Sequence, residues 1–199
     1  MDDLVSFFTE LASTLSPPGD ERAVADRVGS YMADLGLDVS EDDAGSKIGS
    51  NAGNLYARVA ATDGGTPIFL CAHLDTVPPE AGIEPVVEDG VIRNSAGTIL
   101  GADNKSAVVV MLEATRRILA ENRPHGGIEL LFTPMEEVGL HGAAAFDHER
   151  LDEAPRRRWD VGCVETPGVV APEQRPPLDD RHRRSGSEPA KRFRDQRIL

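Results

Sequence analysis

Residues 67–78 read Pro-Ile-Phe-Leu-Cys-Ala-His-Leu-Asp-Thr-Val-Pro, an apolar run followed directly by polar side chains. The run from Pro67 to Ala72 is continuously apolar, which is typical of a strand buried on both faces of a sheet. His73 and Asp75 follow at its carboxyl end. A neutral imidazole is a good metal ligand, and a nearby carboxylate can accept its second ring N–H and fix the tautomer. This stretch therefore predicts a buried strand that ends in a ligand-type histidine.

Helical and strand patterns alternate on both sides of this stretch. Apolar residues at helical spacing predict three further helices, over residues 2–15, 20–35 and 105–121. Short apolar runs predict strands over residues 37–40, 54–60 and 127–133, and a hairpin within 83–93. Strands that alternate with helices indicate a βαβ arrangement. The predicted fold class is therefore α/β, with three α/β/α layers and a largely parallel mixed sheet.

Charge and proline content divide the chain near Val164. Residues 1–153 carry 27 acidic and 10 basic side chains, whereas residues 154–199 carry 7 acidic and 11 basic ones. Residues 165–199 are rich in Pro and Arg and show no helical or strand period, so we expect a disordered tail after a domain over 1–164. The acidic body argues against a nucleic-acid partner, which requires a basic surface.

The chain shows no pattern of membrane insertion or export. It contains no window of about 18 uncharged apolar residues, the length that a membrane-spanning helix requires. The start, Met1-Asp2-Asp3-Leu4, has neither the basic nor the apolar region of a signal peptide. We therefore expect a cytoplasmic protein without a membrane partner.

Two further acidic motifs accompany the histidine motif. Asp103 lies in a Gly-rich loop, and Glu136 and Glu137 follow the predicted strand 127–133. Carboxylates with a single imidazole suit zinc, cobalt or manganese, and shared carboxylate oxygens can hold two such ions about 3.5–4 Å apart. Asp103 is the candidate shared ligand. Adjacent carboxylates repel each other unless a cation separates their roles, so we expect one of the glutamates to bind metal and the other to take a proton.

Taken together, the three motifs resemble the peptidase T branch of the dinuclear zinc aminoacylase and carboxypeptidase family. The matching stretches are His73-x-Asp75-Thr76-Val77-Pro78, Gly101-x-Asp103-Asn104-Lys105 and Glu136-Glu137-x-Gly139-x-x-Gly142-Ala143. The resemblance covers most of the chain before Val164. It implies a zinc-peptidase-like catalytic domain that hydrolyses an amide bond of a small peptide with a metal-activated water.

The resemblance also implies a role for each site residue. His73 would bind one metal ion, Asp103 would bridge two ions, and Glu137 would bind the second ion. Glu136 would act as the general base, and Asp75 would orient the histidine. The implied cofactor is a pair of divalent ions, zinc first, with cobalt or manganese as alternatives. An N-acyl amino acid is an alternative substrate for the same site, and full-length family members are expected to be homodimers.

The chain also departs from the family pattern. Family members place a further acidic ligand after the Glu-Glu pair, at the end of a strand, whereas here the nearby acid is Glu165, one position early. The family pattern continues with a lid and dimerisation domain and a late histidine ligand, which this sequence does not show. We therefore expect an incomplete catalytic domain, truncated or frame-shifted, that is weakly active or inactive alone. The alternative is a non-catalytic remnant that binds one metal ion or none.

Overall fold

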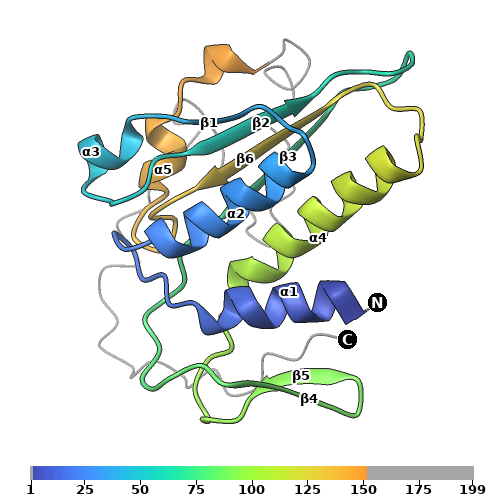
Figure 1. Cartoon of the computed structure of the whole chain (residues 1–199). Coiled ribbons are helices and arrows are strands. Elements are labelled where there is room, and N and C mark those ends of the chain that lie inside the picture. Colours follow the sequence, from blue (N-terminus) through green and yellow to red (C-terminus); the bar gives the residue numbers. More distant parts are fainter. Residues whose placement is uncertain (1, 152–199) are drawn as a thin grey trace, which may run out of the picture.

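A computed structural model of the protein describes residues 2–151 (Figure 1). The helices and strands follow one another as α1 (Asp2–Ser13), α2 (Arg22–Asp34), β1 (Val39–Glu41), α3 (Ala44–Ile48), β2 (Leu55–Val59), β3 (Ile68–His73), β4 (Pro85–Glu88), β5 (Val91–Asn94), α4 (Ala102–Ala120), β6 (Ile128–Thr133), α5 (His141–Ala145) and the 3-10 helix η1 (His148–Arg150). The predicted boundary at Val164, the predicted disorder of 165–199 and the acid Glu165 lie outside the described residues.

Four strands form one sheet in the order β1-β2-β6-β3. β3 and β6 are parallel, in a register that runs from Ile68 opposite Ile128 to His73 opposite Thr133. β2 is antiparallel to β6, and β1 is antiparallel to β2. β4 and β5 form a separate antiparallel hairpin, which Figure 1 shows projecting beyond α1. The parallel pair therefore ends at one edge of the sheet, with His73 and Thr133 side by side.

The predicted α/β class and the mixed sheet are confirmed, but the sheet is less parallel than predicted. Within residues 2–151 only β3 and β6 form a parallel pair, and two of the three strand pairs of the main sheet are antiparallel. Parallel pairing needs a crossover connection, which is usually helical. α4 provides such a crossover between β3 and β6, whereas a loop over residues 60–67 connects β2 to β3.

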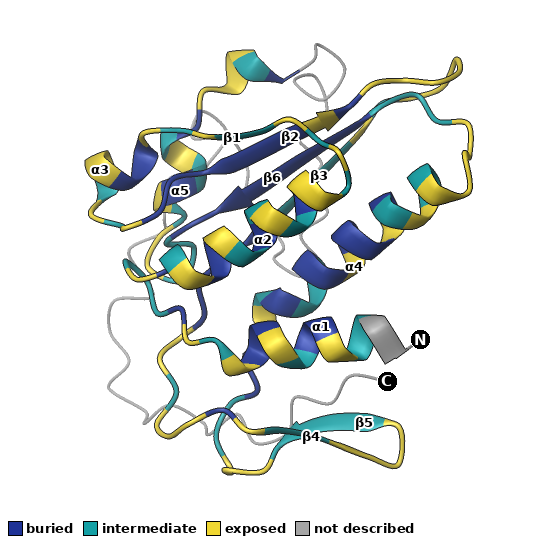
Figure 2. Ribbon diagram, viewed as in Figure 1, coloured by how far each residue is buried: buried dark blue, intermediate teal, exposed yellow. Residues whose placement is uncertain are grey.

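The main core lies between one face of the sheet and the helices α1, α2 and α4 (Figure 2). Alternate strand residues point into it, including Leu55 of β2, Ala72 of β3 and Leu130 of β6. Burial of this apolar area stabilises the fold by roughly 25 cal/mol per Å². The second face carries a smaller cluster of Tyr56, Leu131, Phe146 and Leu151. Long helices therefore cover one face within the described residues, and a short segment around α5 and η1 packs on the other.

No helix among residues 2–151 is long and apolar enough to cross a bilayer.

Candidate metal centre

The candidate residues come from three separate elements that meet at the carboxyl end of the parallel strand pair. His73 is the last residue of β3, and Asp75 follows it in the next loop. Glu136 and Glu137 follow β6, and Asp103 lies at the start of α4. In open α/β sheets this edge is where ligands bind, because the strand ends leave a crevice between the following loops. All five predicted site residues therefore lie at one edge of the sheet.

Three of these residues bring ligand atoms close enough to share an ion. One ligand atom each of His73, Asp103 and Glu137 lie within 4.8 Å of one another. The His73 Nε2 atom is 3.2 Å from a carboxylate oxygen of Asp103 and 3.7 Å from one of Glu136. One imidazole nitrogen and several carboxylate oxygens therefore point to the same small volume.

Histidine 73 is held by contacts on both ring nitrogens. Its residue is 5% exposed, and its Nδ1 atom lies 2.8 Å from the backbone carbonyl oxygen of Asp75. Burial by itself lowers the pKa of His73, but hydrogen bonds with Asp103 and Asp75 and the nearby charges outweigh burial and raise that pKa to about 10. A metal ion at Nε2 requires the neutral imidazole, so metal binding there would release a proton.

Aspartate 75 contacts both the histidine and the glutamate pair. The sequence predicted that Asp75 orients His73, and the Asp75 carboxylate lies 3.5 Å from Nδ1, with the Asp75 backbone carbonyl closer still. The buried carboxylate also accepts the backbone N–H groups of Glu136 at 2.9 Å and Glu137 at 3.0 Å. Burial alone raises the pKa of the Asp75 carboxyl, but these hydrogen bonds and His73 lower it below its usual value.

The glutamate pair follows a residue with an unusual backbone conformation. Met135 has a φ of 55°, in the left-handed region that side chains other than glycine seldom adopt. The turn that it starts places the Glu137 carboxylate in the ligand cluster and leaves the Glu136 side chain 28% exposed. Burial raises the pKa of Glu137, and the carboxylates of Asp103 and Glu136 add to that increase. A cation beside this carboxylate would relieve the repulsion.

Aspartate 103 is the most exposed member of the cluster. Its side chain is 68% exposed, and it lies two residues after Gly101, whose φ of 74° lets the chain turn sharply into α4. The peptide bond between Asp103 and Asn104 is cis. The hydrogen bond from His73 holds the pKa of Asp103 below its usual value. The carboxylate is therefore ionised and open to solvent on one side.

Residues 69–177 match the family described as Peptidase family M20/M25/M40. This chain belongs to that family. The M20/M25/M40 match contains all five site residues, and the chain is also similar to the uncharacterized protein YqjE of Bacillus subtilis (strain 168), with 38% identity over 148 residues, 74% of this chain and 40% of that protein.

Two solved structures support the same relationship. The aminopeptidase PepT from Bacillus cereus shares 41% identity with a TM-score of 0.71, over 75% of this chain and 40% of PepT. A tripeptidase from Staphylococcus aureus shares 36% identity with a TM-score of 0.71, over 76% of this chain and 41% of the tripeptidase. The M20/M25/M40 chain described here thus spans about two fifths of the length of these relatives.

Three buried polar residues near the centre were not predicted as site residues. Ser16 and Glu21 lie between α1 and α2, and Lys105 follows Asp103 in α4. Lys105 is fully buried and donates a hydrogen bond to the backbone carbonyl of Thr14, and burial lowers its pKa to about 8. Nothing in the local sequence distinguishes Ser16 from a solvent-facing loop residue, or Glu21 from a solvent-facing residue at the start of a helix.

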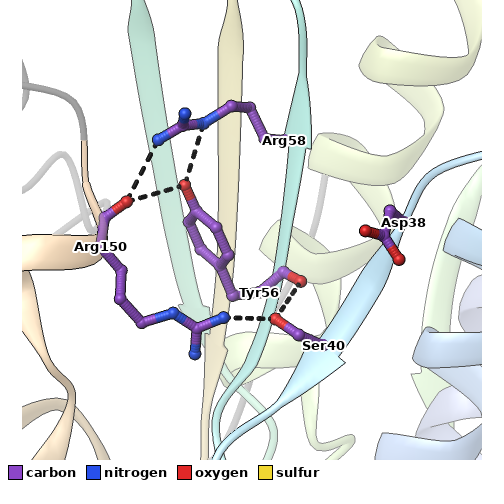
Figure 3. Close-up of a pocket in the computed structure, with 5 residues that line it drawn as sticks. All are labelled: Asp38, Ser40, Tyr56, Arg58 and Arg150. Carbon is purple, nitrogen blue, oxygen red and sulfur yellow. Dashed lines mark hydrogen bonds between the residues drawn. The ribbon is translucent and has the colours of Figure 1, made fainter.

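A separate hollow of about 570 Å³ lies between β1, β2 and the segment that ends in η1 (Figure 3). Its lining residues are Asp38, Ser40, Tyr56, Arg58 and Arg150. The Arg150 side chain donates to the Ser40 hydroxyl at 2.6 Å, and Arg58 donates to the Tyr56 hydroxyl at 3.2 Å. Both guanidinium groups thus bind protein atoms, and the hollow contains none of the metal-centre residues.

Proposed function

We propose that this chain carries the metal-binding core of a metal-dependent peptidase that hydrolyses amide bonds of small peptides. The observation that supports this most directly is the meeting of His73, Asp103 and Glu137 within 4.8 Å, at the strand ends of an M20/M25/M40 fold. The similarity to a PepT aminopeptidase and to a tripeptidase supports small peptides as the substrate class.

The donor set fits one divalent zinc ion, and a second ion would have to share a ligand with the first. Catalytic zinc sites normally use three protein ligands, drawn from imidazole, carboxylate and thiolate groups. His73, Asp103 and Glu137 supply one such set within the described residues. We propose that Asp103, the most exposed of the three, would be the shared ligand of a pair of zinc ions, each of which would then have two protein ligands among residues 2–151. Such ions, when bound, polarise a scissile carbonyl and lower the pKa of a bound water.

The protein's own groups then have separate tasks. His73 donates its Nδ1 proton to the Asp75 carbonyl, so that release of the Nε2 proton on metal binding would leave the lone pair of Nε2 directed at the cluster. Glu136 lies beside the cluster, 3.7 Å from that nitrogen. Its partly exposed carboxylate would take a proton from a water and pass it to the leaving amine. We propose Glu136 as the general base and Asp75 as the residue that holds the glutamate pair.

Calorimetric zinc titration of the chain tests the ligand assignment. We expect zinc binding by the wild type, and at least a 10-fold loss of affinity in Glu137→Gln, because an amide is a weaker ligand than a carboxylate. Glu149→Gln is the matched control, since Glu149 is exposed and lies outside the cluster. Equal affinities of the Glu137 variant and the control would refute the assignment. Two tight sites would contradict the view of the chain as a non-catalytic remnant.

Hydrolysis of a tripeptide panel and an N-acyl amino acid panel by the zinc-loaded chain tests the reaction. We expect cleavage of tripeptides, slow relative to full-length relatives, and a loss of about 100-fold or more in kcat for Glu136→Gln. Zinc affinity should stay unchanged in that variant, because the cluster is formed by other residues. Zinc binding with no cleavage of either substrate class would contradict the enzymatic part of the proposal.

A further inference from the structure

The segment that joins α1 to α2 contacts each of the three chain segments that carry the candidate site residues. We call this segment, residues 14–21, the connector. Its sequence, Thr-Leu-Ser-Pro-Pro-Gly-Asp-Glu, contains none of the proposed ligands. Yet its polar atoms bind the loop after β3, the start of α4 and the turn after β6. A short segment near the start of the chain therefore links loops that are far apart in sequence.

Glu21 is the most unusual residue of the connector, because its carboxylate is fully buried. The residue has 0% exposure, and three donors surround the carboxylate. One oxygen accepts the backbone N–H of Gly19 at 2.8 Å and that of Met135 at 3.1 Å, and the other accepts the Ser50 hydroxyl at 2.7 Å. A buried charge is tolerated only when it is hydrogen-bonded in this way. Glu21 thus occupies a site built for a carboxylate.

Helix capping does not account for this site. Glu21 is the N-cap residue of α2, a position from which a side chain can accept the first free N–H groups of the helix. Its side chain makes no such capping bond. It turns away from α2 and reaches Met135, which is 114 residues later in the chain.

The contact with Met135 continues into the glutamate pair. The backbone N–H of Met135 binds the Glu21 carboxylate, and the next two N–H groups, those of Glu136 and Glu137, bind the Asp75 carboxylate at 2.9 and 3.0 Å. Three successive amides are therefore fixed by two buried carboxylates. Met135, whose φ of 55° is left-handed, is the last residue bound by Glu21, and the two residues after it are bound by Asp75. Such a conformation persists only when its surroundings enforce it.

The rest of the connector fixes the other two ligand loops. Ser16 donates its hydroxyl to the Leu74 carbonyl at 2.8 Å, and its own carbonyl accepts the Thr76 N–H at 3.0 Å. These two bonds flank Asp75 on either side. The Thr14 carbonyl accepts a hydrogen bond from the buried ammonium group of Lys105, which lies two residues after Asp103. Each ligand loop is thereby tied to the same eight-residue segment.

We propose that Glu21 is a positioning residue of the metal centre, through which the connector sets the backbone of Glu136 and Glu137 for metal binding. This inference rests on the proposed function, because it assigns Glu21 to the site that Glu137 is proposed to form. It does not make Glu21 a ligand. The carboxylate acts through the Met135 amide alone.

The test compares Glu21→Ala, Glu21→Gln and the control Asp20→Asn in zinc titration, in amide hydrogen exchange followed by NMR, and in denaturant unfolding. Asp20 is the neighbouring acid, but it is exposed, and within residues 2–151 its carboxylate accepts a hydrogen bond from the Asn51 side chain and does not contact Met135. We expect Glu21→Ala to weaken zinc binding by about 10- to 100-fold, the usual cost of losing a supporting hydrogen bond behind a ligand. Glu21→Gln should lose less, because its carbonyl oxygen can still accept the Met135 N–H. Asp20→Asn should leave the zinc affinity unchanged.

Hydrogen exchange separates positioning from general stability, and it does not depend on zinc. We expect the amides of residues 135–137 to exchange faster in Glu21→Ala, while those of α4 keep their protection. A merely structural role would lower the unfolding free energy with uniform exchange changes and an unchanged zinc affinity of the folded protein, which would overturn the proposal. If Glu21→Ala does not fold, the same measurements on Glu21→Gln decide. If the wild type binds no zinc, the proposed function fails, and unchanged exchange at residues 135–137 would reject the positioning role separately.

Discussion

The Asp75 carboxylate accepts the backbone N–H of Glu137 at 3.0 Å, although 62 residues separate them in the chain. A second oxygen of the same carboxylate accepts the N–H of Glu136 at 2.9 Å, and the Asp75 carbonyl lies 2.8 Å from His73 Nδ1. One buried residue thus joins the histidine of β3 to the glutamate pair after β6. Its main chain contacts the histidine, and its side chain binds the glutamate pair and lies 3.5 Å from the same histidine nitrogen.

Replacing Asp75 with Asn should therefore disturb the glutamate pair more than the histidine. The amide side chain keeps one acceptor oxygen, but its NH2 group faces a backbone N–H, which leaves a buried donor unpaired at a cost of about 1–3 kcal/mol. We expect a fall of that size in the unfolding free energy, together with weaker zinc binding. Asp147→Asn is the control, because that exposed carboxylate also accepts a backbone N–H, at 3.0 Å from Glu149. Equal unfolding free energies for both variants would contradict the interpretation.

Zinc should stabilise the folded chain through His73. A ligand that binds only the folded state adds about 2.7 kcal/mol to the unfolding free energy at a free concentration 100 times its Kd. We expect this increase for the wild type, its removal by a chelator, and its absence in His73→Ala. His141→Ala should keep the increase, because His141 is exposed and lies outside the ligand cluster. Thermal unfolding with and without zinc measures the effect, and a loss of the increase in both variants would point to a different ligand set.

Gly142 should not tolerate a side chain, because the backbone before the glutamate pair packs against it. A Cβ atom at this position would lie 2.4 Å from the Pro134 carbonyl oxygen and 2.6 Å from Pro134 Cδ. Forcing an extra methyl group into such a contact costs about 1–3 kcal/mol. We expect Gly142→Ala to lower the unfolding free energy by this amount. Gly82→Ala should have little effect, since nothing lies within 4 Å of its Cβ position, and equal effects in the two variants would exclude the close contact as the cause.

Glu113 should make the stability of α4 depend on pH. Hydrogen bonds from Arg116 and Arg117 lower the pKa of this glutamate from 4.5 to about 2. Since the folded pKa is the lower one, the stabilisation is fully present above pH 4.5 and is lost as the pH falls toward 2. We expect Glu113→Gln to lower the unfolding free energy by about 1–2 kcal/mol at pH 7, a value reduced for the exposure of both arginines.

Denaturant unfolding across this pH range checks the effect. The difference between wild type and Glu113→Gln should shrink as the pH falls and vanish below about pH 2. Glu121→Gln, at the exposed end of the same helix, should differ from wild type by less than about 0.5 kcal/mol at every pH. A pH-independent difference for Glu113→Gln would show that packing, rather than its ion pairs, is responsible.

Local sequence was sufficient to predict most helices and strands. Helix α4 was predicted from residue 105 and begins at Ala102, and β6 was predicted over 127–133 and spans Ile128–Thr133. Helix α4 has apolar residues at helical spacing over most of its length, and β6 is a short, mostly apolar run. The short helix α3, Ala44–Ile48, was not predicted, because five residues that include Gly45 show too little periodicity. Strand direction was less predictable, since it depends on which strands become neighbours.

The candidate ligands were predictable because each lies in a short motif that can be recognised from the sequence alone. His73, Asp103 and Glu137 are each a ligand type beside a strand end or a glycine, and the structure brings them together. Glu21 and Ser16 were not predictable, because their importance comes from partners 114 and 58 residues away. A glutamate at the start of a helix is ordinarily a solvated, dipole-stabilising residue. Only the tertiary structure shows that this one is buried.

The bond between Glu21 and Met135 also bears on how the protein is made. A ribosome synthesises the chain from its N-terminus, so Glu21 can bind the Met135 N–H only after residue 135 has left the ribosome. Contacts of such long sequence separation require a large loop to close, which slows their formation. A nascent chain that ends before residue 135 cannot form this contact. Under the proposed ligand assignment, a growing polypeptide contains His73 well before Glu137, so that the complete ligand set would form only late in synthesis.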